Sequence, residues 1–388
     1  MRTNGVTNFQ QSVGAPPATP VAGDTYFDTT AKIAYVYDGA AWTPIAPGAS
    51  SSFQMDSGWH YFDAPGEPVF NGNYYNNAGN AWPIARFRRA KDGSVFFELM
   101  PTGLTPGATT IFTMPPGFRP SATIYLPAAT SGGLGCLTIQ PNGIANLSWA
   151  PSHTWSNFAP CTYMAEDIPT PPNWIVPATL GGGWTNGNPP GTGLRYCIDS
   201  AGDYHFSGYI KGGNTGVANP IINIPELADG QAHSFLTVNG VTGAATRIDV
   251  GTTGDIYVQS YYGSGTNAMV SFDGMVVANP NGHWLAPALA NSWIAYGGTY
   301  PTFQNCINKN GIISCRGLVK NGTATANTLM VAASGMIYPP RSQVILMTIA
   351  NAGYARVDPM QSGGVSFQQF FAGGVNSFVG IYGRWLWD

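Results

Sequence analysis

Residues 310–319 have the sequence Asn-Gly-Ile-Ile-Ser-Cys-Arg-Gly-Leu-Val, a tight-turn dipeptide followed by an apolar, β-branched run. Asn-Gly before such a run is a strong local signal for a β-hairpin. Similar marks occur twice earlier, at Asp92-Gly93 before residues 94–98 and at Ala201-Gly202 before residues 203–208. The stretch therefore predicts a strand that recurs along the chain.

The spacing of the turn glycines indicates a threefold repeat. Gly93 and Gly202 are 109 residues apart, and so are Gly202 and Gly311. A second turn glycine follows after 50, 52 and 52 residues in the three copies: Gly143, Gly254 and Gly363. A fixed period of this kind is the sequence signature of tandem modules.

The composition of the 388-residue chain favours an all-β fold. It contains 50 Gly and 31 Pro, and no window shows the sustained 3.6-residue apolar period of a long helix. Hydrophobic residues make up 44% and charged residues only 9%, which provides apolar material for cores but little charge. We predict a small N-terminal β leader followed by three tandem β-sandwich (jelly-roll-like) modules.

Charge and hydropathy exclude two classes of partner. A net charge of −3 with only 16 Lys and Arg gives no electrostatic footprint for nucleic acid. No apolar stretch approaches the ~18 residues of a membrane span, so we expect no membrane insertion. The first residues lack the apolar region of a signal peptide, so we expect synthesis in a cytoplasm.

Small-residue and proline-rich stretches mark the expected boundaries. Residues 46–52 (Ala-Pro-Gly-Ala-Ser-Ser-Ser) form the clearest linker, and residues 168–172 (Ile-Pro-Thr-Pro-Pro) form a stiff connector. The predicted domains are a leader at 1–45, a linker at 46–56, module 1 at 57–167, module 2 at 168–281 and module 3 at 282–388.

The leader is too small to be stable alone. Short strands are predicted at residues 24–28, 33–37 and 42–45, after a polar tail at residues 1–15. Three short strands bury too little apolar surface, so the leader needs copies of itself or a larger assembly.

Cysteine and histidine patterns indicate neither a metal site nor a cofactor. The five cysteines are odd in number and lie singly, so buried free thiols are expected, with a cross-hairpin pairing of Cys306 and Cys315 as the alternative. The five histidines show no metal-ligand spacing. Positions on the polar surface, or in the core with their hydrogen bonds satisfied, explain them.

Two motifs carry a family resemblance. Residues 20–42 contain Gly-Asp-Thr-Tyr-Phe-Asp-Thr-Thr and Tyr-Val-Tyr-Asp-Gly-Ala-Ala-Trp, and this pattern resembles an element near the start of many tailed-bacteriophage structural proteins. The modules are similar to β-sandwich repeats of phage tail and fibre proteins, in which a Leu-Pro-x-Gly-Phe/Tyr-Arg-Pro loop recurs. Residues 114–120 keep that loop almost whole, residues 334–341 keep part of it, and module 2 keeps only Ile224-Pro225.

The resemblance implies a virion structural protein of the tail-fibre or receptor-binding type. We expect a homotrimer, because the leader cannot fold alone and closed symmetry is the default for such assemblies. The modules would form a stalk and head, whose distal loops contact a host-surface glycan or protein. A head or collar fibre, a decoration protein and an envelope-polysaccharide hydrolase stay open as alternatives. Residues 1–45 would attach the chain to other virion proteins through the leader aromatics: Tyr26, Phe27, Tyr35, Tyr37 and Trp42.

No catalytic group is predicted. Most of the 19 acidic residues stand in turn sequences, where hydrogen bonding to the local backbone explains them. Glu98, Glu166-Asp167 and Glu226 remain, without a partner at a spacing typical of catalysis. The chain also lacks a nucleophile elbow and a phosphate-binding loop. We expect a protein that is not an enzyme.

Binding is the better-motivated function. Aromatic rings and amides in loops suit sugars, and the candidates are Trp149, Trp155, Tyr261 and Tyr262. The competing interpretation for each is a core or inter-subunit aromatic. Tyr261 and Tyr262 are predicted at an exposed tip, whereas residues 385 and 387, both Trp, are expected to pack against a neighbouring chain.

Overall fold

The computed structural model describes residues 9–12, 25–28, 33–37, 39–44, 56–71, 74–76, 85–102, 110–148, 154–159, 161–187, 193–240, 242–262, 269–332, 346–350, 353–360, 364–371 and 378–386. The chain divides into two compact units, Met1–Gln54 and Met55–Asp388. The described residues form β-strands and a single 3-10 turn, η1 (Pro225–Leu227), so the all-β class is confirmed. None of these residues belongs to a helix that could cross a membrane.

The N-terminal unit is a four-stranded sheet in the order β1 (Phe9–Ser12), β2 (Thr25–Asp28), β3 (Ile33–Tyr37), β4 (Trp42–Pro44). β1 pairs with β2 in parallel, and the other pairs are antiparallel. The polar tail therefore contributes a strand, which its sequence did not predict. Tyr37 faces Trp42 across the last hairpin, with ring centroids 5.3 Å apart.

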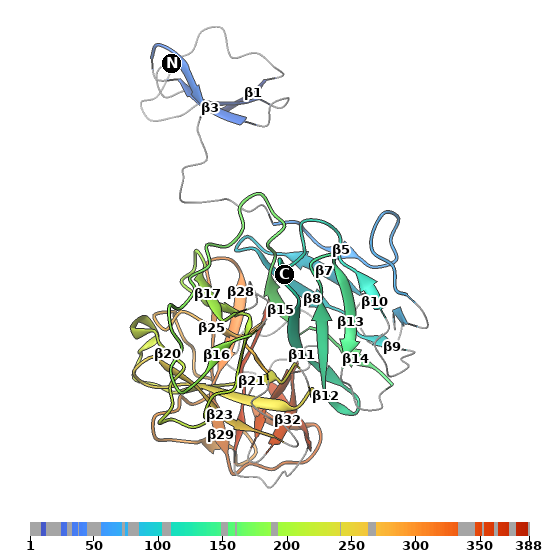
Figure 1. The fold of residues 1–388 in the computed structure, drawn as a ribbon. Coiled ribbons are helices and arrows are strands. Elements are labelled where there is room, and N and C mark those ends of the chain that lie inside the picture. Colours follow the sequence, from blue (N-terminus) through green and yellow to red (C-terminus); the bar gives the residue numbers. More distant parts are fainter. Residues whose placement is uncertain are drawn as a thin grey trace. The chain divides into compact units, whose positions relative to one another are not determined.

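Residues 57–167 form a sandwich of two sheets (Figure 1). One sheet has the order β15 (Thr162–Met164), β8 (Ser94–Glu98), β7 (Arg86–Arg89), β5 (His60–Tyr61). The other has the order β10 (Thr110–Thr113), β13 (Ile144–Ser148), β12 (Gly133–Ile139), β11 (Ile124–Thr130), β14 (Ser156–Asn157). A short pair, β6 (Tyr75–Asn76) and β9 (Pro101–Thr102), lies beside them.

The next two segments repeat this strand order. In module 2 the sheets are β17 (Arg195–Ile198), β18 (Tyr204–Ser207), β25 (Val276–Val277); β20 (Ile222–Asn223), β23 (Asp255–Tyr261), β22 (Ala245–Val250), β21 (His233–Val238); and β16 (Thr185–Asn186), β19 (Tyr209–Lys211), β24 (Val270–Ser271). In module 3 they are β27 (Gln304–Ile307), β28 (Ile312–Arg316), β35 (Gly383–Leu386); and β26 (Ile294–Ala295), β29 (Leu318–Lys320), β34 (Val379–Gly380), β31 (Leu346–Ala350), β32 (Gly353–Pro359), β33 (Val365–Phe371), β30 (Thr328–Val331).

The turn glycines mark equivalent positions in the three segments. Gly93, Gly202 and Gly311 have φ angles of 91°, 86° and 75°, a region that residues with a Cβ rarely adopt. Each lies in the turn just before the second strand of the hairpin β7–β8, β17–β18 or β27–β28. The glycine period in the sequence therefore corresponds to a recurring backbone turn.

One end of the module 1 sandwich, beside β5, β7 and β10, is filled with aromatic rings. We call this end of a module its mouth. Phe62 lies 5.1 Å from Phe87 and 4.9 Å from Phe112, measured between ring centroids. Phe118 lies 4.9 Å from Phe87 in an edge-on arrangement, and His60 stacks on Phe87 at 5.2 Å. Such rings bury large apolar areas, so this end of the core is closed.

The three modules form a closed arrangement rather than a row. The equivalent strands β11, β21 and β31 each contact the other two. Each module has its own core, and one further apolar cluster, which includes Ala129, Val238 and Tyr354, takes residues from all three. The predicted stalk and head is therefore wrong for residues 55–388, which belong to one compact unit.

Two predictions about single residues are settled by burial. Trp385 is 4% exposed in the core of module 3, so its expected contact with a neighbouring chain is wrong; residue 387 lies outside the described residues. All five cysteines are buried and free, as predicted. Cys306 and Cys315 do not pair, because across the hairpin Cys306 faces Ser314 and Cys315 faces Asn305.

Candidate functional site

The turn ends of the three equivalent hairpins carry the most deeply buried ionic group in the described part of the chain. Asp199 Oδ1 accepts hydrogen bonds from the backbone N–H groups of Ala201 (2.7 Å) and Asp203 (2.9 Å). Asp92 Oδ1 accepts one from Ser94 N at 2.8 Å. The turn chemistry expected from the sequence is therefore present, and it fixes these carboxylates in place.

The remaining oxygens of these two acids, and those of the nearby Asp203, contact basic and amide groups from modules 2 and 3. His205 Nε2 lies 3.2 Å from Asp199 Oδ2 and 3.9 Å from Asp92 Oδ2. Arg384 Nη2 lies 2.9 Å from Asp203 Oδ2 and 3.7 Å from Asp92 Oδ2. Asn308 completes the group by donating to Asp203 Oδ2 at 2.9 Å. We call these six residues, which come from all three modules, the junction cluster.

Burial and direct contacts shift two pKa values of the junction cluster in opposite directions. Burial raises the pKa of Asp92 above its usual value, although His205 and Arg384 oppose the shift. Burial also acts upward on Asp199, but the hydrogen bond and charge of His205 outweigh it and hold the pKa of Asp199 well below its usual value. Asp199 is therefore the firmly ionised acid of the two.

The junction cluster also contains a group with metal-ligand geometry. One ligand atom each from Asp92, Asp199 and His205 lies within 4.8 Å of the others. The side chains of Asp92 and Asp199 are 0% exposed, and the Arg384 guanidinium already supplies positive charge at 3.7 Å from Asp92. The geometry therefore suits a structural ion-pair network between modules, in which His205 and Arg384 lie among the three carboxyl groups.

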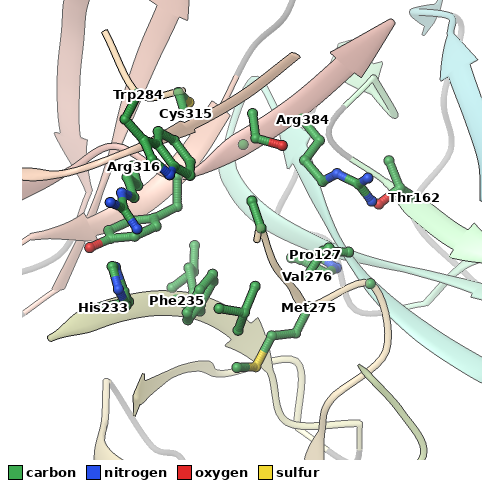
Figure 2. Close-up of a pocket in the computed structure, with 17 residues that line it drawn as sticks. Pro127, Thr162, His233, Phe235, Met275, Val276, Trp284, Cys315, Arg316 and Arg384 are labelled. Carbon is green, nitrogen blue, oxygen red and sulfur yellow. The ribbon is translucent and has the colours of Figure 1, made fainter. Parts of the chain in front are cut away.

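A cavity of about 90 Å³ lies beside this cluster, where the modules meet. Figure 2 shows Arg316, Trp284 and His233 on one side of it and Arg384 with Thr162 on the other. Arg316 Nη1 lies 3.0 Å from Asp229 Oδ2, so this second arginine also joins module 3 to module 2. The cavity is lined by residues of all three modules and belongs to their interface.

Three of the four aromatic residues predicted to bind sugars lie in the described part of the chain, and each packs against an apolar cluster. Tyr261 and Tyr262, at the end of β23, are both half-buried; Tyr261 packs on the module 2 core and Tyr262 on the cluster shared by all three modules. The prediction of an exposed tip is therefore wrong for these two residues. Trp155 is half-buried in the shared cluster, with the Arg356 guanidinium 5.1 Å from its ring. Trp149 lies outside the described residues.

The acids left over from the turns have structural partners, except for one. Glu98 pairs with Arg86 at 2.7 Å, and Glu166 pairs with Arg195 at 2.6 Å. Asp167 accepts the backbone N–H groups of Gly117 at 2.8 Å and Arg119 at 2.7 Å, so it holds the loop at residues 114–120. Glu226 is exposed on η1.

Of the five leader aromatics, the structure describes the side chains of only two. Tyr26 pairs with Tyr35 across β2 and β3, and Phe27 lies in the same strand as Tyr26, but the side chains of these three residues are outside the described set. Tyr37 and Trp42 are half-buried within the N-terminal unit. At least two of the aromatic side chains therefore lie together on one hairpin of the unit.

The comparisons with known proteins add no relatives. No protein-family model matches the chain, and neither a curated protein nor a solved structure is significantly similar to it.

Proposed function

We propose that the chain is a virion structural protein of a tailed phage, attached through residues 1–45 and presenting residues 55–388 to the host surface. The division of the chain at Gln54 supports this proposal, because the boundary between a small strand unit and a much larger unit falls within the predicted linker at residues 46–56. An adhesin needs this separation of an anchoring part from a presenting part. The leader motif at residues 20–42 indicates the virion as the place of attachment.

The hydrolase alternative has the least support. A glycosidase needs two carboxyl groups that reach the scissile bond from a cleft. Asp92 and Asp199, whose ligand atoms lie within 4.8 Å of each other, have fully buried side chains and are fixed by turns and by His205. A polysaccharide cannot reach them without separating the modules.

We further propose that the chain forms a homotrimer and that the N-terminal unit carries the self-association. Four short strands form a marginal core alone. Copies of that unit, or other virion proteins, would supply the missing apolar contacts. Light scattering of the full chain and of a Trp42→Ala variant tests this, with a trimer expected for the former and a smaller species for the latter.

Phage adsorption in the presence of purified full-length protein is the test of function. A receptor-binding protein lowers adsorption to host cells in a saturable way. Folded protein that neither binds cells nor lowers adsorption would instead favour the fibre or decoration alternative. Reducing sugar released from host envelope would favour the hydrolase.

A further inference from the structure

Module 2 has an open groove at its mouth. In module 1, aromatic rings fill the equivalent space. The groove has a volume of about 430 Å³ and lies between the segment at residues 175–181, β17 and β20. A volume of this size falls within the range of small-molecule sites, roughly 300–1,000 Å³. Its principal lining residues are Ile175, Pro177, Thr179, Tyr196, Asn223 and Asp255.

The position of the groove follows from strand register. Phe87 pairs with Phe97 in module 1, and Tyr196 pairs with Phe206 in module 2, so Tyr196 takes the place of Phe87. Met114 and Ile224 also correspond, because their N–H groups donate to the turn glycines Gly143 and Gly254. Beyond Ile224 the chain of module 2 enters η1 and brings no ring back over Tyr196.

One side of the groove is apolar and aromatic. The Tyr196 ring is half-buried, Ile175 is 41% exposed, and the neighbouring Val176 is 62% exposed. A tyrosine that lines a groove beside aliphatic side chains suits the C–H face of a sugar ring, which is weakly polar and flat.

The other side supplies hydrogen-bond groups that are already fixed. Asp255 Oδ1 accepts from Asn223 Nδ2 at 2.9 Å, and Asp255 Oδ2 accepts from Thr253 Oγ1 at 2.8 Å. Each carboxylate oxygen keeps a second lone pair for a ligand hydroxyl. Among the described residues nothing donates to Asn223 Oδ1, and Thr179 offers an exposed hydroxyl.

Charge decides which class of ligand fits. No Lys, Arg or His lines the groove, and Asp255 is its one charged lining residue in the described chain. An anionic ligand would meet this carboxylate without a compensating cation, whereas the hydroxyls of a neutral sugar can donate to it.

We propose that this groove binds a neutral saccharide, with its ring on Tyr196 and its hydroxyls on Asp255, Asn223 and Thr179. This proposal rests on the proposed contact with the host surface and names the site and ligand class for it. Trp155, Tyr261 and Tyr262, the described members of the aromatic set selected from the sequence, do not line this groove.

The test uses the full-length protein and defined sugars. Maltose, lactose and chitobiose serve as neutral probes, and glucuronic acid serves as an anionic control, with saturation-transfer NMR and calorimetry as readouts. We expect saturable binding of at least one neutral probe and none of glucuronic acid. Ala178→Trp places a ring in the groove from an exposed position, and Asn223→Ala removes an exposed amide, so neither opens the core. Each should weaken binding at least tenfold.

Tyr75→Ala is the matched control, because Tyr75 is an aromatic residue 57% exposed in module 1, away from the groove. Its saccharide affinity should equal that of the unaltered protein. Circular dichroism and thermal unfolding confirm that each variant folds. Unchanged affinity in folded Ala178→Trp, or no binding of any neutral probe, would overturn the proposal.

Binding to host cells separates the two proposals. If the unaltered protein binds cells and Ala178→Trp binds them equally well, the groove is not the contact, although the proposed function stands. If saccharide binds in the groove but the unaltered protein does not bind cells, the site stands and the proposed function fails.

Discussion

The mouths of modules 1 and 2 have the same strand frame but different interiors. In module 1, Phe62, Phe87, Phe112 and Phe118 contact one another or a shared neighbour and fill the space. In module 2, the corresponding space is a groove of about 430 Å³ beside Tyr196. A few side chains and one loop on a common strand frame therefore decide whether one end of a β-sandwich is filled or forms a groove.

The loop after the edge strand explains much of the difference. In module 1, residues 114–120 turn back so that Phe118 packs on Phe87, and Asp167 holds the loop through two backbone N–H groups. In module 2, the chain forms η1, and Leu227 enters the core there. The groove is therefore the space that this segment of module 2 leaves uncovered.

The largest expected effect contrasts two equivalent positions. Phe87→Ala removes a ring that is 0% exposed and should lower the free energy of unfolding by about 3–5 kcal/mol. Tyr196→Ala removes a half-buried ring and should cost about 1–2 kcal/mol. Urea unfolding of both variants measures the difference. Equal losses would mean that the two mouths are packed alike.

The next effect concerns the junction cluster, which connects the modules that carry the two mouths. Asp199→Asn weakens a charged hydrogen bond to His205 and should cost roughly 2 kcal/mol at pH 7. Asp92→Asn should cost less, because burial raises the pKa of Asp92 and already disfavours its charged form. Thermal unfolding of both variants tests this order, and a larger loss for Asp92→Asn would contradict it.

The pH dependence of Asp199→Asn sharpens that test. Because the folded pKa of Asp199 is lowered, its contribution is present above the unfolded value of about 3.9 and is lost as pH falls further. The stability deficit of Asp199→Asn should therefore shrink below about pH 4. For Asp92 the sign is reversed: its raised pKa favours the protonated form, so its contribution declines as pH rises through the folded pKa. A deficit of Asp199→Asn that is constant down to pH 2 would rule out this linkage.

A smaller effect is expected where the module 1 mouth is closed. Asp167→Ala frees the backbone N–H groups of Gly117 and Arg119 to bond with water, because this carboxylate is exposed. We expect a loss of about 1 kcal/mol. Hydrogen exchange should also increase at residues 117–119. Unaltered exchange there would show that Phe118 holds the loop without help from Asp167.

The smallest effect comes from copying module 1 into module 2. Ile222→Phe introduces the residue type of Phe112 at the corresponding half-buried position in β20. Additional apolar contact should leave stability unchanged or raise it by less than about 1 kcal/mol, while saccharide affinity falls. Calorimetry on the folded variant measures both quantities. Undiminished saccharide binding would place the ligand elsewhere.

The sequence predicted the features that depend on short-range patterns. Turn glycines, apolar runs and low charge indicated the all-β class, the hairpins and the buried free thiols. These signals are local, because one or two residues determine a turn and strand alternation needs only a few more.

The arrangement of the modules could not be obtained from the same patterns. Arg384 and Asp203 are 181 residues apart in sequence and meet only because the modules close on one another. Asp92 and Asp199 have the sequence context of ordinary turn residues, and Tyr261 and Tyr262 have that of an exposed loop. Side chains at module interfaces obey the same local preferences as exposed ones, so their place depends on the tertiary structure.

The contact of β11, β21 and β31 with one another has a consequence for how such a protein can change. In a ring of identical chains, each substitution appears at every copy of a position, and a recess gained at one is gained at all. Here three unequal copies share one chain, so a mutation alters a single module and leaves the other two unchanged. New specificity can therefore arise at one position of the ring while the other two continue to support the fold.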